Sequence, residues 1–388
     1  MSSATQISTR RDVLGVSALR PDGAAKVSGN FEFSSDLHAE NMLWGATLRS
    51  PHPYARIVNI DLSEAYKILG VEAIITADDV PGKKTYGLIS SDQPVFASDF
   101  VRYVGEPVAA VAADHPETCR RALAAIKVQY EVLTPVTDAE IAILPTTEQI
   151  HPDGNLIRRQ QIKIGDQNLQ GEVVVEGIYE MGMQDQAFLG LEAALAIPDS
   201  GNNGIEMFVA TQWLHEDQKQ IAACLGFPDE KVRITLGGVG GAFGAREDIS
   251  LQVHCALLAL RTSRPIKMQY SREESFYGHV HRHPAKIYIK HHATRAGVIQ
   301  RIEAKMIFDG GAYASTSAAV LINGVTHIQG PYRCENATVD GYAVRTNNPP
   351  CGAMRGFGVV QACYAHESQM DKLAKVCNLS PVEVRLMN

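Results

Sequence analysis

Closely spaced cysteine pairs are absent from this chain of 388 residues. Its seven cysteines lie far apart, and neither CxxC nor another spacing typical of zinc or iron–sulfur ligation occurs. The odd number and the wide spacing also argue against a disulfide framework and favour a reducing compartment. If electrons pass through a site in this protein, the iron–sulfur carrier must therefore belong to another polypeptide.

Long apolar runs and clustered positive charge are absent as well. No apolar run reaches the roughly 18 residues that a membrane span needs, and the net charge of −7 comes without a basic stripe. We therefore expect neither a membrane nor a nucleic acid as partner. The stretch from Thr9 to Leu14 is faintly similar to a twin-arginine export signal, but no apolar segment follows it. A cytoplasmic protein is the expectation.

The positions of proline and glycine residues between apolar segments predict two folded regions in a chain of this length. An N-terminal segment, residues 1–19, precedes a compact α+β region over residues 20–135. Residues 136–170 contain two prolines and an Asp-Gly-Asn turn, which is typical of a linker. Strand and helix patterns alternate more regularly over residues 171–388, which predicts a second and larger α+β domain.

A helix start lies close to the C-terminal residue. Ser380, Pro381 and Glu383 have the layout of a capping box with proline at the first helical position. The chain ends at Asn388, barely two turns later. We therefore expect that either the polypeptide or a partner continues the structure.

The strongest local feature is the glycine-rich stretch GGVGGAFGARE, from Gly237 to Glu247. It connects a predicted strand, 231–236, to a helical pattern over 249–260. A glycine loop in this position exposes backbone N–H groups and lets an anionic ligand approach closely. It is neither a Walker loop nor GxGxxG, because Phe243 stands where the third glycine would be. Cofactor binding and a merely tight connection both remain open, although an exposed Phe in mid-loop is unusual for the latter.

A second motif, Asn347 to Gly358 (NNPPCGAMRGFG), also connects a predicted strand, 338–344, to a helix, 359–377. Arg355 beside Phe357 offers a charged donor next to an aromatic plate, which suits a flat heteroaromatic ligand. The structural alternative is an arginine ion pair and a core phenylalanine.

Gln212 follows the predicted strand 205–210, so it projects from a strand end where ligands commonly bind. A helix cap or a surface residue is the alternative for this position.

Histidines recur at 279, 281 and 283, in an HxHxH pattern that on a strand would place three imidazoles on one face. A metal site is conceivable there. No acidic ligand stands nearby in the sequence, and Arg282 and Pro284 interrupt the segment. Polar residues on a sheet face are therefore the favoured interpretation.

The motifs together are more specific than any one of them. Ala210 to Gln212, Gly240 to Glu247 and Met354 to Gly358, in this order and spacing, resemble the molybdopterin-binding subunit of the xanthine dehydrogenase/aldehyde oxidase family. Leu48 to Ile57 and Tyr103 to Ala109 resemble the small α/β hammerhead domain of that family.

The similarity extends from about Arg20 to the last residue and is greatest to bacterial xanthine dehydrogenases. It implies an α+β fold. The hammerhead domain would occupy residues 20–135, and the first half of the molybdopterin-binding domain would occupy 171–388.

The resemblance implies roles for individual residues. The positions that would line the molybdenum–pterin cofactor are Gln212, Gly241, Phe243, Gly244 and Arg355. Among them, Gln212, Phe243 and Arg355 would lie close to molybdenum, although their side chains would not ligate it. Glu247 would hydrogen-bond and orient a purine, Phe357 would stack on it, and Asn323 takes the place of a substrate-binding Arg.

The family's general-base Glu and its second pterin-binding motif lie further along than Asn388. The resemblance therefore implies that no catalytic residue lies in this chain. It also implies three partners: the C-terminal molybdopterin-binding half, a FAD-binding subunit and a subunit with [2Fe-2S] clusters. The pterin would be plain molybdopterin or its cytosine dinucleotide form.

The expected reaction is hydroxylation of a purine or related N-heterocycle, with water as the oxygen source. Two alternatives stay open: a hydroxylase for an aldehyde or another heterocycle, and a scaffold without catalysis. Gly356 stands where carbon monoxide dehydrogenases have cysteine after the Arg, which argues against that branch of the family.

Overall fold

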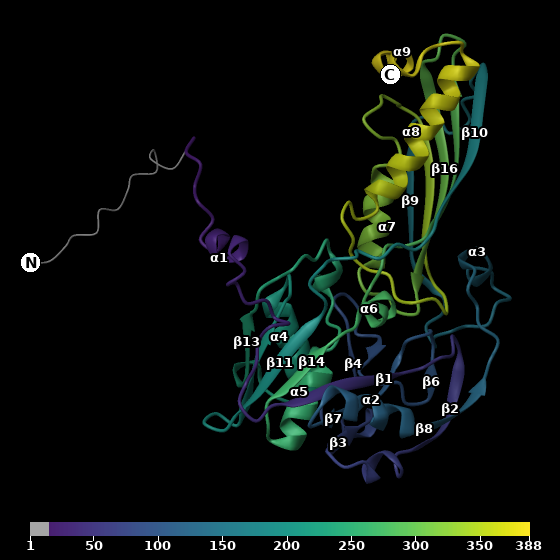
Figure 1. Cartoon of the computed structure of the whole chain (residues 1–388). Coiled ribbons are helices and arrows are strands. Elements are labelled where there is room, and N and C mark those ends of the chain that lie inside the picture. The colour runs from purple at the N-terminus through teal and green to yellow at the C-terminus, as the bar shows by residue number, and fades with distance from the viewer. Residues whose placement is uncertain (1–14) are drawn as a thin grey trace, which may run out of the picture.

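The computed structural model describes residues 15–388 and shows two sheets with helices packed on them (Figure 1). The stretch from Thr9 to Leu14 lies outside the described residues. Smaller elements surround the sheets: α1 (Gly23–Val27), η2 (Ala65–Lys67), η3 (Ala77–Asp79), β4 (Thr85–Tyr86), β5 (Gln93–Pro94), η4 (Asp229–Lys231), η5 (Ala245–Glu247) and α6 (Arg272–Gly278).

The larger sheet combines strands from both predicted regions. Its order is β13-β12-β11-β14-β1-β7-β3. The bounds are β1 (Leu43–Arg49), β3 (Val71–Ile75), β7 (Pro107–Ala113), β11 (Ala193–Asp199), β12 (Gly204–Val209), β13 (Val232–Leu236) and β14 (Ile266–Gln269). β1 pairs in parallel with β14, Leu43 lying opposite Ile266. The hammerhead region therefore shares one continuous sheet with the following region.

Both faces of this sheet are covered by other elements, so its central strands must be apolar on both sides, as β7 is. α4 (Leu214–Leu225) and α5 (Gln252–Thr262) pack on one face. The opposite face carries α2 (Pro116–Ala125) and a small sheet of β2 (Ala55–Asp61), β6 (Phe100–Val101) and β8 (Lys127–Val132). All seven residues of β7, PVAAVAA, are buried. Small apolar side chains on both sides of a strand allow close packing from two directions.

The second sheet stands apart from the first, with order β10-β15-β16-β17-β9. Its strands are β9 (Leu156–Ile164), β10 (Val173–Met181), β15 (Ala285–Ala293), β16 (Ile299–Gly311) and β17 (Ala337–Arg345). α7 (Ser317–Thr326) and α8 (Val359–Val376) cover one face, and α9 (Pro381–Met387) packs against α8 (Figure 1).

The stretch 136–170, predicted as a linker, contributes to this sheet. It contains α3 (Ala139–Ala142) and the whole of β9, which pairs with β17. Ile157 and Ile162 of β9 pack against the core between the sheet and its helices. The proline and glycine residues thus mark the start of a strand and not a linker. The sequence pattern did not indicate this strand, because the side chains on its exposed face are polar.

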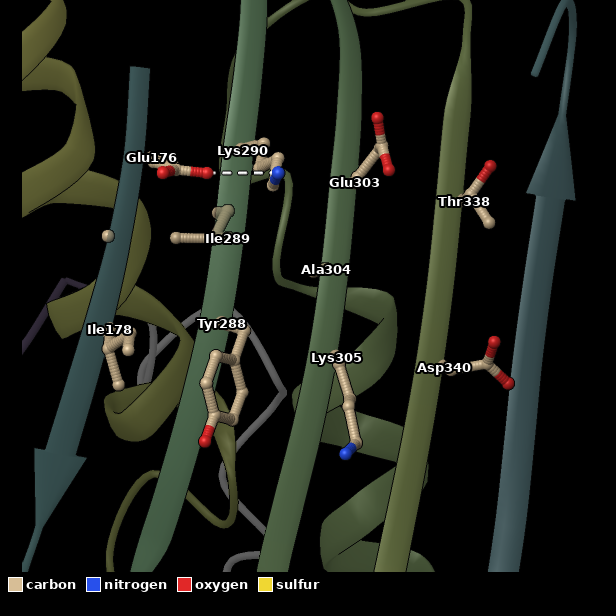
Figure 2. A pocket seen from close by; sticks show the side chains of 11 residues that line it. Glu176, Ile178, Tyr288, Ile289, Lys290, Glu303, Ala304, Lys305, Thr338 and Asp340 are labelled. Carbon is tan, nitrogen blue, oxygen red and sulfur yellow. Dashed lines mark ion pairs between the residues drawn. The ribbon is translucent and has the colours of Figure 1, made fainter. Parts of the chain in front are cut away.

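The other face of the second sheet is open and charged. A shallow hollow of about 560 Å³ lies on it, flanked by side chains such as Tyr288, Glu303 and Lys305 (Figure 2). Glu176 and Lys290 form an ion pair of 2.9 Å across neighbouring strands. The glycine-rich loop, Arg355 and Phe357 do not line this hollow, so the sequence motifs point elsewhere in the molecule.

The predicted capping box of α9 is confirmed, and α4 has a well-defined end. Gly226 ends α4 in the left-handed conformation, with φ of 66°. At the start of α9, Ser380 N–H donates to Glu383 at 2.7 Å and Glu383 N–H donates to Ser380 Oγ at 3.1 Å, which completes the capping box. All seven cysteines are free thiols. Across residues 15–388, no helix combines the length and apolar character needed to cross a bilayer.

The Asn347 side chain connects the second sheet to the hammerhead region through hydrogen bonds. Its Oδ1 accepts from Val136 N–H at 2.8 Å, and its Nδ2 donates to the carbonyl of Arg102 at 2.9 Å. The side chain is almost fully buried. Both backbone groups would lose their partner away from water if this amide were removed.

We expect Asn347→Ala to lower the free energy of unfolding by about 2–4 kcal/mol, because two buried backbone groups become unsatisfied. Thermal and denaturant unfolding of the purified chain measure the effect. Asn168→Ala, in an exposed turn, is the matched control and is expected to change stability by less than about 0.5 kcal/mol. Equal stability of the two variants would contradict this account of Asn347.

Candidate active site

A cavity of about 650 Å³ lies where the hammerhead region, the glycine-rich loop and the second sheet with its helices meet. Six residues predicted as site residues line it together: Gln212, Phe243, Gly244, Glu247, Arg355 and Phe357. They come from the end of β12, the loop after β13 and the loop before α8. Stretches that lie far apart in the sequence therefore form one wall.

A backbone hydrogen bond joins the two motif loops. Arg355 N–H donates to the carbonyl of Phe243 at 2.8 Å. Gly244 lies so close to the second loop that a Cβ on it would be 2.7 Å from the carbonyl oxygen of Ala353. This close approach requires glycine, since real Cβ atoms do not come that near to backbone.

Both aromatic residues of the cavity adopt a strained backbone. Phe243 has φ of 53° and Phe357 has φ of 46°, in the left-handed region that bulky residues rarely adopt. Such strain persists only where surrounding contacts hold it, and it is concentrated at functional sites. Phe243 remains about half exposed, at 49%, despite its apolar ring. The fold therefore holds Phe243 at the cavity against both backbone strain and the hydrophobic effect, whereas Phe357 is partly buried and packs against the core of the second sheet.

Gln212 is attached to the glycine-rich loop through its oxygen. Its Oε1 accepts from Gly244 N–H at 3.1 Å, and its backbone N–H donates to the carbonyl of Arg246 at 2.9 Å. With Oε1 occupied, the Nε2 amide is the group left to donate to a ligand. Gln212 is thereby fixed as a hydrogen-bond donor at the cavity.

Burial is the main influence on the pKa values of the acidic side chains near the cavity. Burial raises the pKa of Glu247, whose carboxyl lines the cavity. Burial likewise raises the pKa of Asp248 to about 7, although the Ser315 hydroxyl donates to it at 2.8 Å. Asp217, in the first turn of α4, is fully buried, and burial raises its pKa to about 7 as well. Burial therefore makes the carboxyl groups beneath and beside the cavity harder to ionise than they are in water.

Two predicted residues lie behind the wall and not on it. Asn323 Nδ2 donates to the carbonyl of Phe357 at 2.7 Å, so the side chain supports the strained loop from α7. Gly241 lies against Phe188, where an added Cβ would be 2.9 Å from the Phe188 Cβ. Direct contact of these two residues with substrate or cofactor stays a prediction.

Other lining residues were missed from the sequence. The hammerhead region supplies Leu88 and Ile89, in the connection between β4 and β5. Trp213 and the beginning of α7, at Thr316 and Ala319, complete the wall. Leu88 and Ile89 carry no chemical signal, but Trp213 directly after Gln212 could have been flagged as an aromatic residue at a strand end.

The histidine segment differs from the favoured interpretation. His279, His281 and His283 lie before β15 and are buried, so they are not polar residues on a sheet face. The rings of His279 and His281 stack with centroids 5.1 Å apart, whereas His283 Nε2 lies 2.8 Å from Ser317 Oγ. Asp185 and Glu192, nearly 100 residues earlier, supply the acidic neighbours that the local sequence lacks.

Two family models match consecutive parts of the chain. Residues 28–134 match the a/b hammerhead domain of aldehyde oxidase and xanthine dehydrogenase, and residues 150–388 match the molybdopterin cofactor-binding domain. The chain belongs to the molybdenum-cofactor-binding subunits of the xanthine dehydrogenase/aldehyde oxidase family. The predicted resemblance and the predicted fold, a hammerhead domain followed by a molybdopterin-binding domain, are thus confirmed.

Named members of this family differ in how much of their length the chain matches. It is 39% identical to the nicotinate dehydrogenase large molybdopterin subunit of Eubacterium barkeri, covering 97% of this chain and 89% of that one. It is 38% identical to a protein of Bacillus subtilis named as a probable xanthine dehydrogenase subunit, covering 96% of this chain but only 50% of that protein. The aldehyde oxidoreductase structure from Desulfovibrio desulfuricans superposes with a TM-score of 0.92 at 26% identity, covering 97% of this chain and 44% of that chain.

The cavity fits the cofactor that this family binds. Its wall offers a glycine loop without side chains, the Gln212 donor and the exposed cation of Arg355. α7 and α8 both begin at the cavity, and helix N-termini favour negatively charged groups. Molybdopterin carries a phosphate and hydrogen-bonding ring atoms, so this donor-rich wall matches its chemistry.

Asp217→Asn is expected to stabilise the protein increasingly as pH rises. The folded-state pKa of about 7 exceeds the ordinary value of 3.8, so wild-type stability is fully present below pH 3.8 and is lost as pH rises to 7. The asparagine variant avoids this loss, by an amount on the order of 2–4 kcal/mol at pH 8. Thermal melts from pH 4 to pH 8 measure the difference between the two proteins.

The exposed Asp229→Asn is the matched control for the removal of one carboxyl group. A stability gain of Asp217→Asn that does not grow between pH 4 and pH 8 would show that this carboxyl is already ionised in the fold.

Proposed function

We propose that this chain supplies one wall of the active site of a molybdenum hydroxylase that acts on an N-heterocycle. The observation that carries the proposal is the single cavity in which Gln212, the glycine-rich loop, Glu247, Arg355 and Phe357 meet. In the overall reaction a ring C–H and water become C–OH, with release of two electrons and two protons. When bound, the molybdenum–pterin group supplies the electron-accepting centre.

The chain's own residues then bind and orient. Gln212 Nε2 and the Arg355 guanidinium donate hydrogen bonds where negative charge is held or develops. Phe243 and Phe357 both line the cavity, and we propose that a flat substrate is held between their rings. Asn323 holds the backbone of Phe357, and the Arg355–Phe243 hydrogen bond holds the backbone of Phe243. The positions of both aromatic residues are therefore fixed before a ligand binds.

Glu247 favours a nitrogen heterocycle over an aldehyde. Its carboxyl lines the cavity and can accept from a ring N–H or, when protonated, donate to a bare ring nitrogen, two groups that a simple aldehyde lacks. The names of two relatives refer to the N-heterocycles xanthine and nicotinate, which supports this substrate class. An aldehyde is the alternative, since the superposed Desulfovibrio enzyme is named an aldehyde oxidoreductase.

The proposed assembly contains further polypeptide. The general base and the second pterin-binding motif would come from a C-terminal molybdopterin-binding half, and electrons would leave through [2Fe-2S] clusters and FAD on partner subunits. The scattered cysteines of this chain support the need for a separate iron–sulfur carrier. Either molybdopterin or its cytosine dinucleotide form fits the proposal, as does a cytoplasmic location.

Co-expression of this chain with the C-terminal half and both redox subunits tests the function. We expect one molybdenum per complex by metal analysis and hydroxylation of a purine or pyridine substrate, with ¹⁸O incorporated from labelled water. A complex that assembles without molybdenum would overturn the enzymatic proposal in favour of the scaffold. A complex that contains molybdenum but oxidises only aldehydes would overturn the substrate class.

Glu247→Ala should lower kcat/KM for the heterocycle by roughly 30- to 150-fold, which corresponds to about 2–3 kcal/mol. Glu247→Gln, which keeps an acceptor oxygen without the charge, should lose less. Because burial raises the Glu247 pKa, acceptance of a ring N–H by the carboxylate should strengthen as pH rises through that value, and Glu247→Gln should lose this pH dependence. Kinetics that are unchanged in both variants would show that Glu247 does not contact the substrate.

A further inference from the structure

Asp185, His279 and His281 converge behind the glycine-rich loop, apart from the cavity described above. Asp185 Oδ2 lies 3.1 Å from His279 Nε2 and 3.4 Å from His281 Nε2. One ligand atom from each residue can be chosen so that all three lie within 4.8 Å of one another. His281 is only 2% exposed, and the Asp185 side chain is 6% exposed. Three potential metal ligands are therefore packed together away from water.

Hydrogen bonding leaves this cluster incomplete. Neither ring nitrogen of His281 has a hydrogen-bond partner, and Asp185 Oδ2 has none despite its two imidazole neighbours. Both carboxylate oxygens of Glu192, whose Oε1 lies 3.9 Å from His279 Nε2, are also without partners. Unsatisfied buried polar groups of this kind are costly, and they are rare in native proteins. A cation among them would give these ligand atoms the partner that they lack.

The orientation of His279 suits a metal ligand. Its Nδ1 lies 2.8 Å from the carbonyl oxygen of Val280 and must carry a proton to donate there. In the neutral ring this leaves the Nε2 lone pair facing Asp185. The Ser275 hydroxyl lies 3.1 Å from this nitrogen and would have to turn its proton away for a metal ion to take the lone pair. A backbone carbonyl behind a ligating imidazole is the usual arrangement in metal sites, since it fixes the tautomer and the ring orientation.

We infer that Asp185, His279 and His281 bind a divalent transition-metal ion of the zinc type, with Glu192 as the fourth ligand. Ligand atoms about 2.1 Å from a tetrahedral zinc ion are about 3.4 Å apart, which compares with the 3.1 and 3.4 Å observed here. Two imidazole nitrogens with carboxylates suit zinc, whereas calcium and magnesium prefer oxygen ligands alone. Four protein ligands would leave no open position, so the site is structural.

The neighbours of these ligands hold the wall of the cavity. Gln186 Nε2 donates to the carbonyl of Ala353 at 2.9 Å, and Arg282 donates to the carbonyl of Arg355 at 2.8 Å. Arg282 also donates to Gln184 at 3.0 Å, which ties together the two segments that carry the ligands. A bound ion would therefore fix the segments on which the Arg355 loop rests. This inference does not depend on the proposed reaction.

Metal analysis of the purified chain of 388 residues tests the site directly. After chelator treatment and dialysis against zinc sulfate, we expect one zinc ion per chain and a higher melting temperature than for the metal-free protein. Cobalt(II) in place of zinc should give the intense visible absorption of tetrahedral coordination. Absence of stoichiometric zinc in the folded wild-type chain, or octahedral cobalt spectra, would overturn the inference and leave an ion pair of His279 with Asp185 as the explanation of the cluster.

His281→Ala and Asp185→Asn should each weaken zinc binding at least tenfold and abolish the zinc-dependent rise in melting temperature. His215→Ala, an exposed histidine on α4, is the matched control and should bind zinc as the wild type does. Wild-type affinity in His281→Ala would overturn the assignment. If the variants do not fold, the cobalt spectrum of the wild-type chain still decides, and it is independent of molybdenum content and of turnover.

Discussion

The hydrogen bond from Arg355 N–H to the carbonyl of Phe243 is the contact on which the cavity depends. It joins loops that leave two different sheets, and each loop holds an aromatic residue in a left-handed conformation. Gly244 permits the approach, since any side chain there would meet Ala353. The two strained residues thus lie on either side of this junction. The shape of the cavity therefore depends on the relative placement of the two sheets.

Buried charge is the second constraint on this region. Carboxyl groups of Asp217, Asp248 and Glu192 lie in the protein interior near the cavity, and burial raises the pKa of each. Such groups weaken the folded state relative to apolar residues of similar size. Their presence beside a donor-rich wall indicates that the sequence accommodates polar function at some expense of stability, as functional sites commonly do.

The sequence predicted the local elements and most of the cavity wall. Strand, glycine loop and helix follow one another around Phe243 and Phe357 as expected, because hydrophobic periodicity and glycine positions are local signals. Strand β9 was missed because its outward side chains are polar. Asp185 was not linked to His279 and His281, because their proximity arises only from tertiary folding. Leu88 and Ile89 carry no signal of their own, and only their place in the fold brings them to the cavity.

The sheet shared by the two regions has a consequence for how the chain folds. β1 cannot acquire its neighbour β14 until more than 200 further residues have been synthesised, since Leu43 pairs with Ile266. Until then one edge of the hammerhead strands remains unpaired, and exposed edges of this kind readily join other chains. Contacts between such distant segments also slow folding, because a long loop must close first. A nascent chain of this protein would therefore expose this edge of β1 until β14 has left the ribosome.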